Sequence, residues 1–186
     1  APVEETGLRI LPGHRLLLKH ELTGEHIDEM GEYFETKEVA LDDAANFLKE
    51  NEDTTSFIVH DGKRTLGLIL KDGESIKKFM SKDYSEDYRE LDVVILRDVI
   101  FEGIMNTGDL AIDVDISYER WSKDAIRKVD TGEGSIAFLV NATKPEQVLK
   151  IAKRGERMPE KSTDFYPKVN SGFILMDISA AEKINK

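Results

Sequence analysis

The segment Leu91 to Met105 restricts the fold more than any other part of the sequence. After Asp92 its only charged residues are Arg97, Asp98 and Glu102, which fall on one narrow stripe of a helix. A helix that is apolar on nearly all sides has to be buried, because it has no broad face suited to water. We therefore expect a central helix here, with Asp92 at the N-cap and the rest of the domain packed around it.

Short apolar runs bounded by turn residues indicate the strands. The clearest pair, 56–60 and 65–70, flanks Asp61-Gly62, which predicts a hairpin because glycine tolerates the positive φ of the turn. Two further strands, 8–11 and 15–18, are expected on either side of the Pro12-Gly13 turn. The remaining strands are predicted at 113–118, 135–140 and 171–178.

Capping residues followed by apolar positions three and four apart indicate the other helices. Thr23 is expected to cap a helix that carries Ile27, Met30 and Phe34. Segment 82–90 is polar and predicts a loop. Further helices are expected to begin at Asp42-Asp43, to span 122–130, and to run from the capping box Thr143-Lys144-Pro145-Glu146 to Gly155.

This mixture of hairpins and strand–helix alternation predicts one α+β domain with a mixed, mostly antiparallel sheet. We assign residues 1–7 to a linker, 8–180 to the domain and 181–186 to a tail. The abrupt start before the first strand leads us to expect a domain truncated or separated from a larger protein.

Composition excludes several classes of protein and site. The sequence of 186 residues contains no cysteine, which rules out disulfides and thiolate metal sites. Its net charge of −11 argues against nucleic acid as a partner, because such binding needs an excess of Lys and Arg. It has neither a run of about 18 apolar residues nor a signal peptide, so we expect a cytoplasmic protein without a membrane partner.

Motifs for cofactor and metal binding are also missing. Neither glycine-rich phosphate-binding motif occurs, and Thr131–Ser135 follows a helix instead of preceding one, so it predicts a helix end. His20 and His26 are six apart, which does not fit a helical zinc site. The acids Asp109, Asp113 and Asp115 are interpreted as a solvated edge. We expect no cofactor and no metal.

A basic segment stands out in this acidic chain. Residues 144–168 carry a net charge of +3, whereas the rest of the chain carries −14. Part of this charge serves a helix C-terminus. The remainder places Arg157, Lys161 and Lys168 among the side chains of Ser162, Thr163, Phe165 and Tyr166, in a stretch stiffened by two prolines. Such donors can bind an oxyanion. The alternative is a crossing loop whose aromatics fill the core.

Segment 155–168, with Ser171-Gly172-Phe173 after it, resembles the closing signature of a bacterial and archaeal family known as domain of unknown function 1015. Segments 8–16 and 91–96 are similar to two other stretches of that family, in the same order. Two positions depart from its pattern, since Glu160 stands where members tend to have proline and Asp164 where they tend to have an aromatic. Both add negative charge beside the predicted anion site.

The resemblance implies that an N-terminal half, with a Gly-His-His-Arg-Tyr-type motif, precedes this part in full-length members. That motif is similar to one in ParB/sulfiredoxin-like proteins, some of which handle nucleotide phosphates. Our first hypothesis is therefore an anion-binding module for a phosphorylated small ligand, completed by that half as its partner. Its predicted site comprises Arg157, Lys161, Ser162, Thr163, Tyr166 and Lys168, with His14 and Arg15. An autonomous phosphotransferase and a structural or oligomerisation domain are the alternatives, so enzymatic activity stays open.

Overall fold

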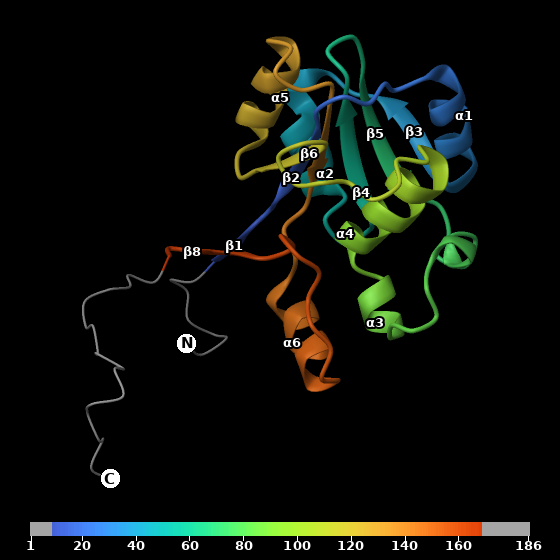
Figure 1. The fold of residues 1–186 in the computed structure, drawn as a ribbon, viewed down its shortest axis with the longest axis vertical. Helices are drawn as coiled ribbons and strands as arrows, with labels where there is room; N and C mark the ends of the chain where they lie inside the picture. Colours follow the sequence, from blue (N-terminus) through green and yellow to red (C-terminus); the bar gives the residue numbers. More distant parts are fainter. Residues whose placement is uncertain (1–8, 169–186) are drawn as a thin grey trace.

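The computed structural model describes residues 9–168, and its main feature is a six-stranded sheet (Figure 1). The strands are β2 (His14–Leu17), β3 (Phe34–Glu38), β4 (Ser56–His60), β5 (Thr65–Leu70), β6 (Ile116–Glu119) and β7 (Ile136–Val140). Their order is β3-β5-β4-β7-β2-β6, and all described neighbours are antiparallel. The expected α+β class with a mostly antiparallel sheet is confirmed.

A second, two-stranded ribbon pairs β1 (Arg9–Leu11) with β8 (Asp164–Tyr166). Figure 1 shows this ribbon extending away from the main sheet, in blue and red. It joins the first and last described parts of the chain, and β1 leads directly through the Pro12-Gly13 turn into β2.

The helices vary in type and length. Those that pack on the sheet are α1 (Gly24–Tyr33), α2 (Ala44–Glu50), preceded by the 3₁₀ turn η1 (Leu41–Asp43), α4 (Asp92–Ile95) with η3 (Leu96–Ile104), and α5 (Ser122–Asp130). Below the sheet in Figure 1 lie α3 (Glu86–Arg89) and α6 (Pro145–Lys153), while the 3₁₀ turn η2 (Lys77–Phe79) packs on η3. Among the described residues, no helix is both long and apolar enough to cross a membrane.

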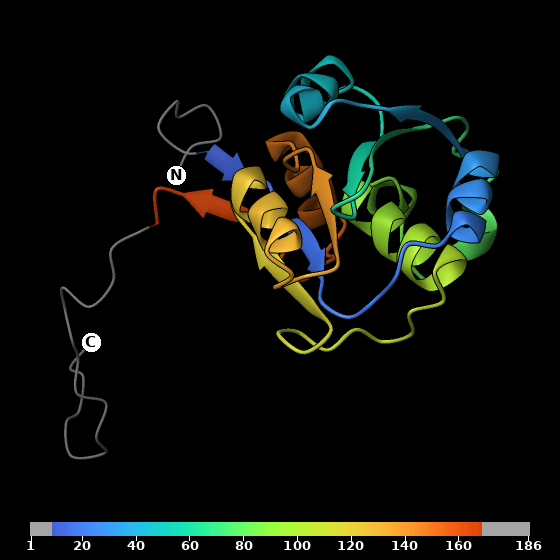
Figure 2. The same ribbon diagram turned by 90° about the horizontal axis from the view of Figure 1, so that it is seen from above.

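The two faces of the sheet carry separate cores, because successive strand residues point to opposite sides. Leu17, Phe57 and Phe138 face α1 and the helix of residues 92–104. Leu16 and Ile58 face α2 and α5 on the other side. In Figure 2 strands β4 and β5 run between the cyan α2 and the green helix of residues 92–104.

Helices α4 and η3 together form the central helix predicted from the sequence. Val94 is 1% exposed and Ile100 is fully buried, so its central position is confirmed. Most of it is a π-helix: the Met105 N–H donates to the Ile100 carbonyl, five residues earlier, at 2.8 Å. Gly103 lies against Phe79, where a Cβ would come within 2.5 Å of the ring.

The caps predicted for two helices are placed differently in the structure. The central helix is capped at Leu91, while the Asp92 carboxylate accepts a hydrogen bond from Thr55 Oγ1 at 2.9 Å. Helix α6 is capped at Lys144, whose N–H donates to Gln147 Oε1 at 2.8 Å. Thr143 instead donates through its hydroxyl to the Ser162 carbonyl. In both cases the polar side chain that the local motif assigned to a helix cap forms a hydrogen bond with a residue distant in the sequence.

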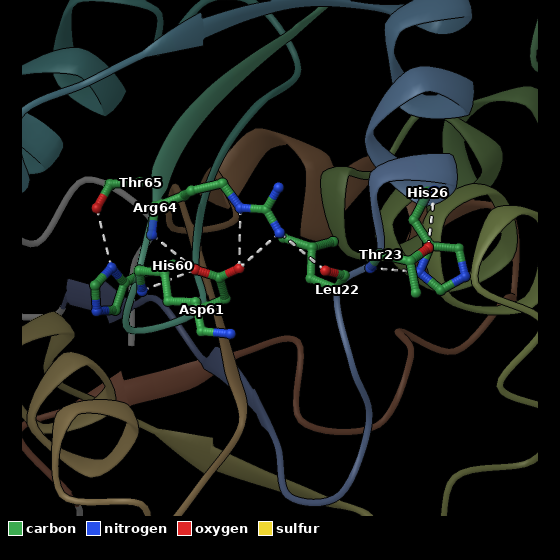
Figure 3. Close-up of polar contacts among 8 residues, drawn as sticks. Leu22, Thr23, His26, His60, Asp61, Arg64 and Thr65 are labelled. Atoms are coloured by element: carbon green, nitrogen blue, oxygen red, sulfur yellow. Dashed lines mark hydrogen bonds and ion pairs between the residues drawn. The ribbon is translucent and has the colours of Figure 1, made fainter.

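The hairpin β4–β5 and the cap of α1 are confirmed and lie next to each other in Figure 3. Asp61 accepts from the backbone N–H groups of Lys63 and Arg64, closing the turn. Arg64 also reaches the Leu22 carbonyl at 3.0 Å, just before the Thr23 cap. This arginine therefore attaches the hairpin turn to the start of α1.

Three predicted boundaries need correction. The first helix ends at Tyr33, and Phe34 begins the edge strand β3, which the helical spacing did not reveal. Helix α3 forms inside the segment predicted as a loop, with Ser85 as its cap. The strand near 113–118 covers only 116–119. The strand predicted at 171–178 lies outside the described residues.

Candidate functional site

The closing segment of the described chain crosses the edge of the sheet beside the Pro12-Gly13 turn. Lys161 has a φ of +55°, and its carbonyl points at Gly13, where a Cβ would come within 2.9 Å of that oxygen. Only glycine permits this approach without a shift of one backbone segment. The contact places the segment against the turn that leads into β2.

A groove with a cavity volume of about 620 Å³ lies where this segment meets the end of β6. Lys161, Thr163 and Lys168, which the sequence analysis assigned to a predicted anion site, line it. The opposite wall comes from the residues between β6 and α5, which the sequence analysis missed. The full lining is Gly13, Tyr118, Glu119, Arg120, Trp121, Asp124, Lys161, Thr163, Asp164 and Lys168.

Three cations and three carboxylates line this groove, and one of the carboxylates, Asp164, pairs with two of the cations. Asp164 accepts from Arg120 Nε at 2.6 Å and also forms an ion pair with Lys168. Burial alone would raise the pKa of Asp164, but the hydrogen bonds from Lys168 and Arg120 outweigh burial and lower it. Lys161 has no ion pair within residues 9–168. It is therefore the cation most available to an added anion.

Aromatic side chains surround the cations of the groove. Trp121 is 56% exposed although it lines the groove, and it is the only tryptophan in the sequence. The Arg120 guanidinium lies 5.8 Å from the centre of the Tyr166 ring. Phe165 and Tyr166 are both exposed, so the aromatics do not fill the core as the alternative reading of this segment required. Exposed aromatic faces beside cations are suited to a planar, negatively charged ligand.

Five of the eight residues predicted for the anion site do not line this groove, namely Arg157, Ser162, Tyr166, His14 and Arg15. Ser162 is buried, and its hydroxyl donates to the Pro159 carbonyl at 2.6 Å, so it shapes the loop. Arg157 is exposed and does not line the groove. Tyr166 is adjacent through its stacking on Arg120 but is not itself a lining residue.

His14 and Arg15 point to opposite faces of the sheet, because they are successive residues of β2. His14 Nδ1 accepts from the Val140 N–H at 3.2 Å. Burial, followed by the charge of Arg15, lowers the pKa of His14 to about 4, so it is neutral near pH 7 and cannot act as a cation there. Arg15 lines a second, smaller cavity on the other side of Tyr118.

The described residues contain no group of three or more His, Asp or Glu side chains that could hold a metal ion. Asp115 instead accepts from the Ala111 N–H, within the turn that precedes β6. His26, one of the two histidines weighed as zinc ligands, accepts through Nδ1 from the Thr23 N–H at the start of α1.

The fold resembles that of free serine kinase. A mutant of that enzyme, solved with AMP, superposes with a TM-score of 0.52 and 19% identity, over 89% of this chain and 57% of that one. Another mutant, solved with ADP, gives a TM-score of 0.52 and 16% identity, over 89% and 56%. A conserved hypothetical protein from Pyrococcus furiosus gives 0.50 and 17%, over 89% and 59%.

This chain therefore spans less than two thirds of each of these structures. At such identities the likeness concerns the fold alone. No family model and no curated protein matches the sequence.

One feature of the sequence could have indicated the wall of the groove that was not predicted. Arg120 and Trp121 stand together directly after the last residue of β6, and neither belongs to an apolar face. Their proximity to Lys161 depends on the pairing of β2 with β6 and of β1 with β8, which local sequence does not encode.

Proposed function

We propose that this chain is a binding module for a phosphorylated small molecule of the nucleotide class. The observation that carries the proposal is the groove itself, which brings Lys161, a cation without an ion pair in residues 9–168, together with Thr163, Arg120 and the exposed Trp121. In this arrangement Lys161 and the Thr163 hydroxyl bind the phosphate, and the indole of Trp121 stacks on the base.

Asp164 limits how tightly the groove binds an anion. Because it already pairs with Arg120 and Lys168, a phosphate has to displace this carboxylate before it gains those two cations. We infer moderate affinity that falls with added chloride, since the pairs are partly exposed and salt screens them.

The structural likeness supports the nucleotide class. Free serine kinase has been solved with AMP and with ADP, and this chain shares its fold over 89% of its own length. The chain covers only 57% of that enzyme's length, which is compatible with a site that a second part of a longer protein completes. We propose the N-terminal half of the family that the sequence resembles as that second part, in cis or in trans.

Fluorescence of the single tryptophan tests the site directly. AMP and ADP should quench Trp121 in a saturable titration, because a stacked base alters the surroundings of the indole. Inorganic phosphate should compete with the nucleotide while quenching little by itself. Lys161→Ala should weaken binding about tenfold, as expected for the loss of one charge-assisted hydrogen bond.

Lys153→Ala is the matched control, because Lys153 is exposed on α6 and does not line the groove. It removes the same charge and should leave nucleotide binding unchanged. Thermal unfolding provides a second readout, since a ligand at 100 times its Kd stabilises the fold by about 2.7 kcal/mol. If neither AMP, ADP nor phosphate changes the fluorescence or the melting temperature, the segment is scaffold and the structural or oligomerisation role is favoured.

A turnover assay separates a binding module from an autonomous phosphotransferase. The purified chain should bind nucleotide without hydrolysing it, because residues 9–168 contain no group of three or more side chains that could hold a metal ion for phosphoryl transfer. Robust ATP hydrolysis by the chain alone, abolished by Lys161→Ala, would instead identify a complete enzyme. Addition of the proposed N-terminal half should then change binding or turnover only if the site is shared.

A further inference from the structure

A second cavity, of about 220 Å³, lies between the central helix and the β2–β6 pair, separated from the groove by Tyr118. Figure 1 shows β2 and β6 beside each other in the sheet. The walls of the cavity combine apolar and charged side chains. They are Arg15, Val93, Arg97, Phe101, Glu102, Thr107, Gly108, Asp109, Leu110, Ile116, Tyr118, Pro159 and Glu160.

Arg15 is a buried cation without an acidic partner in the described chain. It is only 5% exposed, and its one side-chain hydrogen bond there runs to the Gly13 carbonyl. Its guanidinium lies 5.5 Å from the centre of the Tyr118 ring. Burial lowers the pKa of Arg15 to about 10, so the side chain is still charged at neutral pH. A guanidinium has five N–H donors, and most of those of Arg15 remain for a ligand in the cavity.

Carboxylates surround the exposed part of the same cavity. Glu102 comes from η3, Asp109 from the loop before β6, and Glu160 from the closing segment, and all three are exposed. Arg97 balances them only in part, because its guanidinium is held by Asp98 at 2.5 Å and forms a longer ion pair, of 3.8 Å, with Glu102 alone of the three. Burial, and then the charges of Asp98 and Asp109, raise the pKa of Glu102 against the opposing effect of Arg97. The mouth of the cavity therefore favours a cation.

We propose that this cavity binds a small zwitterion of the free amino acid class, with its carboxylate on Arg15 and its ammonium among Glu102, Asp109 and Glu160. A simple anion would leave the three carboxylates uncompensated, and a simple amine would leave the charge of Arg15 uncompensated. Only a ligand with both charges compensates the two sets. The volume equals roughly seven water molecules at about 30 Å³ each, which restricts the ligand to a small one. Val93, Phe101 and Ile116 supply apolar surface for its side chain.

This inference stands apart from the nucleotide groove, since it rests on different charged residues. The experiment therefore uses no nucleotide. Each of the twenty L-amino acids is added in turn to the full chain, and the melting temperature is recorded. We expect a subset of small amino acids to raise it in a saturable manner.

The best ligand is then compared by calorimetry with the acid that lacks its amino group and with its carboxamide. The zwitterion should bind at least about tenfold more tightly than either analogue, because each analogue loses one set of charge-assisted hydrogen bonds. Equal binding of the deaminated acid would overturn the proposal in favour of a plain anion site, and equal binding of the carboxamide would exclude a role for Arg15. No response to any amino acid would also refute it.

Two variants locate the ligand. Arg15→Met should abolish binding while leaving the melting temperature without ligand unchanged or higher, because it removes a buried charge that has no acidic partner in residues 9–168. Glu102 is exposed, so Glu102→Gln should not impair folding. It should weaken the binding of the zwitterion but not the binding of the deaminated acid. Glu50→Gln on α2 is its control and should have no effect. If Glu102→Gln leaves amino acid binding intact, the ligand does not sit in this cavity.

Discussion

Asp164 accepts a hydrogen bond from Arg120 Nε at 2.6 Å, although the two residues lie 44 positions apart in the sequence. The same carboxylate also pairs with Lys168. One acidic side chain thus holds two of the cations that line the groove, and it connects β8 with the residues that follow β6. If the groove binds phosphate as proposed above, Asp164 competes with that phosphate for the two cations.

Replacement of this competitor should strengthen anion binding. In Asp164→Asn both cations become available, so the Kd for phosphate or AMP should fall several-fold. The fold itself should lose no more than about 1 kcal/mol, because the ion pairs are partly exposed. Calorimetric titration and urea unfolding measure the two effects. Weaker anion binding in this variant would show that Asp164 positions the cations for the anion instead of competing with the anion for them.

Charge inside the central helix should prevent folding. Val94→Asp and Ile100→Asp each place an unpaired carboxylate where the native side chain is fully or almost fully buried, at a cost of several kcal/mol. We expect no soluble protein from either variant. Leu149→Asp, at an exposed position of α6, is the control and should express normally. Cooperative unfolding of both core variants would show that the helix is peripheral.

Gly67 should not accept a larger residue, because of its contact with Phe47. A Cβ at Gly67 would lie 2.4 Å from the Phe47 ring, which packs on β5 from α2. Gly67→Ala should therefore destabilise the fold by about 1–3 kcal/mol in urea unfolding. Gly31→Ala in α1 meets nothing within 4 Å and should instead stabilise it by about 0.5–1 kcal/mol. Equal effects of the two variants would contradict this account.

Asp92 should make the fold more stable at mildly acidic pH. Burial raises the pKa of Asp92 from its ordinary value of 3.8 to about 6, against the opposing hydrogen bond from Thr55. Between these values the folded state binds the proton more tightly, so this contribution decreases as the pH rises from about 4 to 6. Asp92→Asn keeps an acceptor for Thr55 and should gain about 1–2 kcal/mol at pH 7, since partial exposure reduces the full effect.

His14 should have the opposite pH dependence. Its pKa falls from 6.5 to about 4, so below pH 6.5 the unfolded chain takes up a proton that the folded state refuses. This contribution costs about 2 kcal/mol of stability at pH 5 relative to pH 7.5. His14→Asn places an acceptor near the Nδ1 position and should remove that loss. The effects of His14 and Asp92 partly cancel between pH 4 and 6, so urea unfolding should be followed against pH in both single variants.

Local patterns predicted those elements whose stability depends on neighbours in sequence. The stripe of charge on segment 91–105 identified a buried helix, and Asp61-Gly62 identified the β4–β5 hairpin. Thr23 caps α1 as expected, with His26 as its partner. In each case the residues that determine the element lie only a few positions apart, so the local sequence is enough to predict it.

The candidate site was predictable only in part. Of the residues assigned to the anion site, Lys161, Thr163 and Lys168 share one groove, while their binding of an anion stays a prediction. Ser162 turned inward because its backbone and hydroxyl are used by Thr143 and Pro159. His14 and Arg15 were assigned to one site, yet the alternation of a strand separates them onto two faces.

By itself the sequence determined the α+β class, the central helix and the presence of a basic segment, because hydrophobic period and local charge specify these. Only the tertiary structure decided three relationships. Arg120 and Trp121 line one groove with Lys161, and Asp92 accepts a hydrogen bond from Thr55 instead of capping a helix. Arg15 is buried in a second cavity that Glu102, Asp109 and Glu160 also line. These relationships depend on which strands pair. Strand pairing is set by the packing of the whole domain, so no single stretch of sequence contains it.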